Sequence, residues 1–210
     1  MTTLRLITAP AIEPITLNDL KLHLRVTEIE ERDSGGTEAV IEDSLLNTLI
    51  VTARKMIEGL CGPLISQTWE QYEQDFPADN IIRIWKPRVT TFTSLIYTDE
   101  DSVATTLSAT NYTTDLIDEF RPKIVLKNDY SWPTVILFEA NPIKLTFTCG
   151  YGSTDDDVPE PIKQAMLLFC SHLYENREMY NISISGNSVV PIPWTMEALI
   201  APYRAWGFDS

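Results

Sequence analysis

Residues 143–175 read IKLTFTCGYGSTDDDVPEPIKQAMLLFCSHLYE, and this stretch joins the clearest strand of the chain to a long helix. Apolar and polar side chains alternate through residues 143–149, which predicts a strand with one face in a core. Apolar residues then recur at helical spacing over residues 162–174, after Pro159 and Pro161, which a first helical turn tolerates. The stretch therefore predicts a sheet that ends where a helical region begins.

The strand belongs to a longer strand-rich region, residues 64–150. Thr, Tyr, Trp, Phe, Ile and Val dominate this region, and turn-forming stretches at 77–80, 99–102 and 141–142 divide it into short runs. We expect several short antiparallel strands.

Two helices are expected before the strand-rich region. Thr16 is a candidate N-cap for a short leucine-rich helix, with Asp19 in place of the usual Glu of a capping box. A longer helix is predicted from Val40 to Leu60, where Gly62 supplies a C-cap. Residues 28–36 between them are acidic and end in two glycines, which predicts a solvated loop.

These elements predict an α+β fold in which N-terminal helices and a C-terminal helical region flank a β-rich middle. The expected parts are an N-terminal helical part at 1–63, a β-rich part at 64–150, a further helix at 151–180 and a C-terminal docking segment at 181–210.

Composition limits the classes of function. With 30 acidic and 16 basic residues among 210, the formal net charge is -14, which argues against nucleic-acid binding by phosphate neutralisation. The start of the chain lacks a basic flank followed by an apolar segment, and no stretch approaches the ~18 apolar residues of a membrane span. We expect a soluble, cytosolic protein without membrane contact. The three cysteines have no C-x-x-C spacing, which indicates buried, reduced thiols.

Candidate catalytic and metal-binding residues are few. The two histidines, His23 and His172, lie on different predicted helices without metal-ligand spacing. His172 could form an acid-base pair with Glu175, although such pairs are common without function. The acidic triplet at 155–157 lacks the Gly and final Glu of a calcium loop, and the sequence has no phosphate-binding or nucleophile motif. We therefore predict no catalytic residue, no metal and no cofactor.

The C-terminal segment carries the candidate partner-binding residues. Prolines divide residues 181–193, and a short helix is expected after Thr195. Aromatic, aliphatic and cationic side chains of the kind that dominate interfaces follow closely: Trp194, Leu199, Tyr203, Arg204 and Trp206. We expect this segment to order against a partner; the alternative is that it docks on its own domain.

Short sequence pieces in a fixed order carry a resemblance to a known family. They run from about Pro14 to Arg204 and comprise Ile15 to Val26, Ala53-Arg54, Ile57-Glu58, Gln67-Thr68-Trp69, Pro87, Val89, Tyr97, Tyr112, Trp132-Pro133, Gly150-Tyr151-Gly152, Val158-Pro159, Ile162 to Ala165 and His172 to Glu178. In this order they resemble the head-tail connector proteins, or adaptors, of long-tailed double-stranded DNA phages, related prophages and gene-transfer particles. The chain departs from the family at residues 98–102, where a Gly-containing turn is common.

The resemblance implies a helical domain that is interrupted by a β-rich insertion at 64–150 and completed by the helix at 151–180. It also implies a non-enzymatic structural role. The expected assembly is a homo-oligomeric ring of about twelve subunits below the portal protein, in the neck of a virion assembled in the host cytoplasm. The ring would extend the channel through which duplex DNA passes without specific binding, and would receive a tail-side stopper or tail-completion protein. Two alternatives remain at this point: a tail-side neck or completion protein of the same particle, and a small hydrolase using His172.

Overall fold

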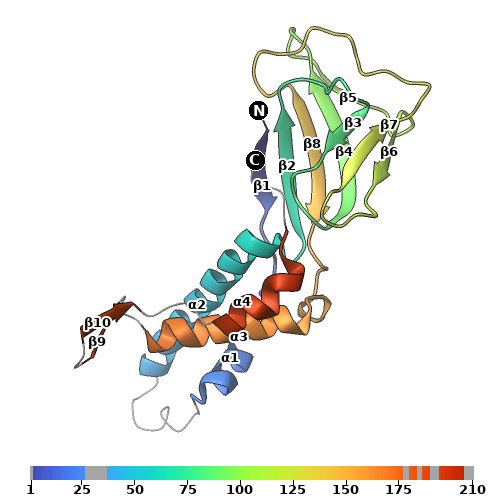
Figure 1. The fold of residues 1–210 in the computed structure, drawn as a ribbon. Helices are drawn as coiled ribbons and strands as arrows, with labels where there is room; N and C mark the ends of the chain where they lie inside the picture. The colour runs from blue at the N-terminus through green and yellow to red at the C-terminus, as the bar shows by residue number, and fades with distance from the viewer. Residues whose placement is uncertain (1, 27–36, 177–179, 184–185, 190–193, 206–210) are drawn as a thin grey trace. The chain divides into compact units, whose positions relative to one another are not determined.

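The computed structural model describes residues 2–26, 37–176, 180–183, 186–189 and 194–205 (Figure 1). The predicted acidic loop at 28–36 lies outside these residues. The chain divides into two compact units. The β unit consists of residues 1–11, 65–153 and 205–210, and the helical unit consists of residues 12–64 and 154–204. Residues 1–11 thus belong to the β unit, unlike the predicted N-terminal helical part.

A five-stranded sheet organises the β unit. In spatial order its antiparallel strands are β1 (Thr3–Thr8), β2 (Gln67–Glu73), β8 (Ile143–Cys149), β4 (Val89–Thr98) and β5 (Ala104–Thr106) (Figure 1). Strand β1 was not predicted from the sequence. It adds to the sheet edge beside β2, where Leu4 lies opposite Gln71.

The predicted strand at residues 143–149 is confirmed as β8 at the centre of this sheet. Its side chains alternate between buried and half-buried along the whole strand. Ile143, Leu145 and Phe147 are fully enclosed, and they give one face of the sheet to the core. The alternation of apolar and polar residues in the sequence thus corresponds to burial of every second side chain, in a strand that pairs with a neighbour on each side.

A second sheet of three strands shares this core. Its order is β3 (Ile81–Arg83), β7 (Lys123–Leu126) and β6 (Tyr112–Asp115). Ile82 and Ile124 from this sheet belong to the same apolar cluster as Phe147. The buried Gln71 links the sheets, because its Nε2 donates to the carbonyl of Arg83 at 2.8 Å and its Oε1 accepts from the Trp85 amide at 2.8 Å.

The turn between β4 and β5 forms without glycine. Ser102 adopts the left-handed conformation with φ of 64°, the region that a Gly would occupy most easily. The Ser102 amide donates to the Asp99 carbonyl at 3.0 Å, and the Asp99 carboxylate accepts from the Val103 amide at 2.9 Å. The acidic stretch at residues 99–101 therefore still builds a hairpin.

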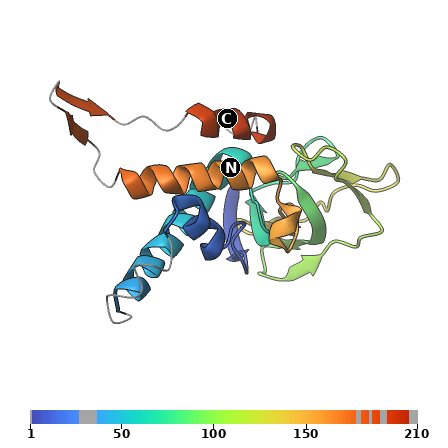
Figure 2. The same ribbon diagram turned by 90° about the horizontal axis from the view of Figure 1, so that it is seen from below.

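Among the described residues, the helical unit contains four α-helices. They are α1 (Leu17–Leu24), α2 (Thr37–Cys61), α3 (Glu160–Glu175) and α4 (Trp194–Ile200), with short 3₁₀ turns η2 (Asp155–Asp157) and η3 (Ala201–Tyr203). Helix α3 contacts each of the other three, and Figure 2 shows it with α4 on one side and the two N-terminal helices on the other. Its buried side chains include Ile162, Met166 and Phe169. The prediction that this helix forms the core together with the long N-terminal helix is confirmed.

Local signals fix the ends of the helices. Thr16 caps α1, because its side chain accepts from the Asp19 amide at 3.1 Å while the Asp19 carboxylate accepts from the Thr16 amide at 3.0 Å. Asp19 therefore completes the predicted capping box. Gly62 ends α2 with φ of 84°, and its amide donates to the Glu58 carbonyl at 2.9 Å.

Residues after α3 differ from the irregular segment expected at 181–193. Two short strands, β9 (Tyr180–Ser183) and β10 (Gly186–Val189), pair antiparallel. The paired residues are close in the sequence, because Gly186 lies opposite Ser183. The pattern was missed because four-residue strands of mixed polarity carry little periodicity.

Candidate functional site

The C-terminal residues predicted to bind a partner lie on or beside α4. This helix packs on α3, and its Met196 and Ile200 are each only 1% exposed. Leu199, Tyr203 and Arg204 are half-buried. The helix α4 therefore packs within the helical unit, and the expectation that the segment orders against a partner stays a prediction.

The five predicted residues are described to different extents. Trp194 is the first residue of α4, and only its backbone is described. Trp206 lies outside the described residues. Of the rest, Leu199 lies on α4, Tyr203 ends η3 and Arg204 follows it. The alternative in which the segment docks on its own domain fits the arrangement of α4.

The described residues offer no candidate metal-binding group. They contain no cluster of three or more His, Cys, Asp or Glu side chains that could hold a metal ion. The His172 carbonyl accepts from the backbone amide and the side chain of Asn176 at 3.0 and 2.9 Å, which is an ordinary helix ending. Asp157 caps η2 by accepting from the Thr154 hydroxyl at 2.7 Å. Within the same residues, no helix combines the length and apolar content needed to cross a membrane.

A buried arginine organises the helical unit. Arg54 on α2 is 7% exposed, and it binds Glu13 and Glu58 at 2.7 and 2.8 Å. Burial acts to lower the pKa of Arg54, but the hydrogen bonds and charges of the two glutamates raise the pKa overall. Glu58 also accepts from the Leu64 amide at 3.2 Å. The cluster joins the segment before α1 to the end of α2.

A second buried arginine lies in the β unit at the start of β4. Arg88 is 5% exposed, and its guanidinium lies 5.2 Å from the Phe120 ring centroid and 4.3 Å from that of Tyr151. Its backbone adopts φ of 54°, and its carbonyl accepts from the Gly150 amide at 3.0 Å. Nearby, the Ser66 amide donates to the Gly152 carbonyl at 2.8 Å. These contacts tie together two of the places where the chain leaves the β unit, near residues 65 and 153.

Apolar side chains are exposed at one end of the β unit, a feature that the sequence analysis missed. Val103, Val135, Ile136 and Phe138 are 56%, 45%, 67% and 39% exposed, and we call these four residues the tip patch. The run from Val135 to Phe138 was absorbed into the strand-rich region because its composition is that of a buried strand. Only the pairing of this run with the β4–β5 turn shows which side chains face outward.

Comparison with known sequences identifies no relative. No protein-family model matches the chain, and no curated protein matches it.

Solved structures do share the fold. A chain in the neck of an empty gene transfer agent (GTA) particle, computed with C6 symmetry, has a TM-score of 0.75 at 23% identity over 96% of this chain and 95% of its own. A chain in the virion of a native GTA particle has a TM-score of 0.73 at 22% identity over 99% and 100%. A chain in the neck of a native GTA particle computed with C12 symmetry has a TM-score of 0.72 at 21% identity over 96% and 94%. The chain therefore has the fold of these particle chains along nearly its whole length.

Proposed function

We propose that this chain is a structural, non-enzymatic subunit of the neck of a phage-like particle, namely a head-tail connector or adaptor. The observation that carries the proposal is the likeness in fold to chains of GTA necks, which covers almost all of both chains and both units. Fold alone does not fix a function. The ordered set of connector-like sequence pieces, which is independent of that likeness, points to the same role.

In this role the chain forms a homo-oligomeric ring below the portal protein. Two of the similar structures are necks computed with C6 and C12 symmetry, which supports a ring. Each subunit of a ring offers one surface to a different surface of its neighbour. A net charge of -14 on every subunit suits a channel through which DNA slides, because acidic walls repel phosphates.

The proposed partners are the portal protein on the head side and a stopper or tail-completion protein on the tail side. Duplex DNA would pass through without specific binding. Assembly would begin in the host cytoplasm and end in the neck of the virion.

Cryo-electron microscopy of particles that carry a tagged copy of the chain tests the proposal. We expect a ring of this fold next to the portal. A ring that contacts only tail components would support a tail-side neck or completion protein instead. Particles that lack the chain would contradict both roles.

A further inference from the structure

The exposed apolar residues of the tip patch are held in place by backbone pairing. The Glu100 amide donates to the Ile136 carbonyl at 3.0 Å, and the Phe138 amide donates to the Thr98 carbonyl at 3.1 Å. Between them, Leu137 lies opposite Asp99 in a β-bridge and packs against the core. Because side chains alternate along an extended segment, Ile136 and Phe138 face the side opposite to Leu137. Their exposure is therefore imposed by the fold.

The loop that carries the patch is also anchored before and after it. The Trp132 ring stacks on Phe76 with centroids 5.0 Å apart, and its Nε1 donates to the Asp79 carbonyl at 3.2 Å. Beyond the patch, the Gln74 side chain donates to the Glu139 carbonyl at 2.8 Å. A preformed apolar surface costs little ordering entropy when a partner binds.

Acidic residues predominate in the segments that carry this surface. Within residues 99–103 and 127–141 there are five acidic residues and one basic residue. The acidic residues are Asp99, Glu100, Asp101, Asp129 and Glu139, and all but Asp99 are exposed. The basic residue, Lys127, donates to the Thr110 carbonyl at 2.7 Å. An apolar centre with a charged rim is the usual anatomy of a protein interface, and here the rim is negative.

The negative rim indicates the chemistry of the partner. An acidic rim disfavours nucleic acid and anionic lipid. A second copy of this chain is also a poor match, because it carries a net charge of -14 and several basic side chains of its β unit are already engaged. These engaged pairs are Arg83 with Asp79, Arg88 with Glu119, Lys123 with Asp115, Lys144 with Glu70, and Lys86 over the Trp69 ring.

We propose that the tip patch is a docking surface for a different protein, one that presents apolar side chains flanked by lysine or arginine. The patch lies at the end of β4 near Thr98, whereas the chain leaves the β unit beside the start of β4, near residues 65 and 153. Ten residues of strand separate these ends, roughly 30 Å at ~3.3 Å per residue. This end of the β unit is thus remote from its chain connections.

The test uses the full chain and two synthetic peptides of equal length with the same leucine face. One peptide carries lysines at its other positions and the second carries glutamates. We expect the lysine peptide to bind, with NMR amide shifts confined to residues 98–103 and 135–139. The glutamate peptide should bind at least about tenfold more weakly, equivalent to about 1.4 kcal/mol.

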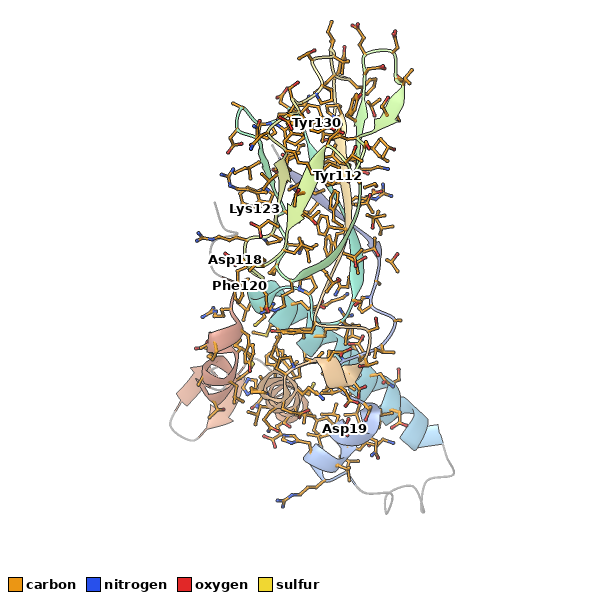
Figure 3. The ribbon with its side chains drawn as sticks, turned by 90° about the vertical axis from the view of Figure 1, so that its right-hand side faces the viewer. Asp19, Tyr112, Asp118, Phe120, Lys123 and Tyr130 are labelled. Carbon is orange, nitrogen blue, oxygen red and sulfur yellow. The ribbon has the colours of Figure 1, made fainter. Side chains whose placement is uncertain are left out.

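Variants locate the binding. The double variant Ile136→Ser with Phe138→Ser should weaken binding of the lysine peptide at least about tenfold. The matched control is Ile117→Ser, because Ile117 is 93% exposed but lies far from the tip patch. It precedes Glu119, whose carbonyl accepts from the Arg88 amide at the opposite end of β4. Figure 3 shows the neighbouring Asp118 and the loop residue Tyr130 toward opposite ends of the β unit. The control should bind like the parent chain.

Several outcomes would overturn the proposal. Equal binding of the two peptides, shifts elsewhere in the chain, or unchanged binding by the double variant would each remove the tip patch as the site. Self-association that the double variant abolishes would assign the patch to a second copy. Binding to phosphatidylcholine vesicles that the double variant abolishes would assign the patch to lipid. Melting temperatures of all variants check that the fold is intact.

Discussion

At the scale of single residues, several connector-like sequence pieces correspond to positions that the fold constrains. Arg54 and Glu58 form the buried ion cluster of the helical unit. Gln67 is 3% exposed at the start of β2, and Gly150 has a backbone conformation that L side chains rarely adopt, with φ of 137°. These residues satisfy buried polar groups or permit close backbone contact. The fold therefore accounts for them without a binding site.

Gly150 should tolerate no side chain. A Cβ there would meet the backbone carbon and oxygen of Ile65 at 2.7 Å and the Ser66 amide nitrogen at 2.8 Å. Backbone atoms cannot move aside as a flexible side chain can. We expect Gly150→Ala to lower the free energy of unfolding by about 3 kcal/mol or more, measured by urea denaturation.

Gly59 provides the matched control for this glycine. It lies within α2, and a Cβ added there meets nothing within 4 Å. Gly59→Ala should raise the free energy of unfolding by about 0.4 to 1 kcal/mol, because alanine lowers the entropy of the unfolded chain. Equal effects of the two substitutions would contradict the steric role assigned to Gly150.

Cys170 should make stability depend on pH at the alkaline end. All three cysteines are buried, and burial raises the pKa of the Cys170 thiol from 9.0 to about 12. The folded chain then retains a proton that the unfolded chain loses. This contribution to stability is fully present below about pH 9 and is lost as the pH rises toward about 12.

The measurement compares the parent chain with Cys170→Ala. Urea denaturation from about pH 9 to about pH 11 should show a steeper loss of stability in the parent chain, because only the parent carries this thiol. The variant also controls for lysine and tyrosine titration, which both chains share. Parallel pH profiles would show that the buried thiol does not contribute.

At the scale of elements, the strongly periodic segments were predictable from the sequence. The alternation in β8 and the helical spacing in α2 and α3 each reflect burial on one face. The pattern alone therefore predicts which side chains face the core. Strand β1 was not predictable, because it pairs with β2 more than sixty residues later in the sequence and most of its side chains are exposed. The tip patch was missed for a related reason. The pairing of Leu137 with Asp99 determines which side chains of the patch face outward, and these two residues are far apart in the sequence.

Helix α3 should depend strongly on Phe169. This side chain is 6% exposed on the central helix of the helical unit. Phe169→Ala should cost about 3 to 5 kcal/mol, through lost burial and a residual cavity. The control is Gln164→Ala, because Gln164 is exposed on the same helix. Thermal denaturation should show a large drop for the first variant only, and an unchanged melting temperature for Phe169→Ala would place that side chain outside the core.

The C-terminal helix α4 should contribute to the stability of the helical unit. Met196 and Ile200 are buried and α4 contacts α3, so we expect removal of residues 188–210 to uncover an apolar face and to lower the melting temperature. Met196→Ala with Ile200→Ala should reproduce most of the loss. A deletion without any effect on melting would show that α4 is held loosely in the free chain.

At the scale of the whole molecule, charge is the property that most constrains function. The chain carries 30 acidic against 16 basic residues, and several of the basic side chains already pair with carboxylates. The two buried arginines stabilise local structure, so they present no cation to a ligand. Few Lys and Arg side chains therefore remain to bind a phosphate backbone. Composition and the ion pairs of the described residues thus both argue against tight binding of DNA.

The purified chain should therefore bind duplex DNA very weakly at physiological salt. Protein–DNA affinity comes largely from release of counterions when Lys and Arg neutralise phosphates, and a chain with net charge -14 has no excess of these residues. Fluorescence anisotropy with a labelled duplex should show no saturation in the micromolar range, and lowering the salt should not produce the steep gain in affinity typical of phosphate contacts. Sub-micromolar binding that weakens as salt is added would reveal a basic surface that the sequence and the described residues do not predict. That result would also argue against an acidic channel wall, because a wall that binds DNA would slow its passage.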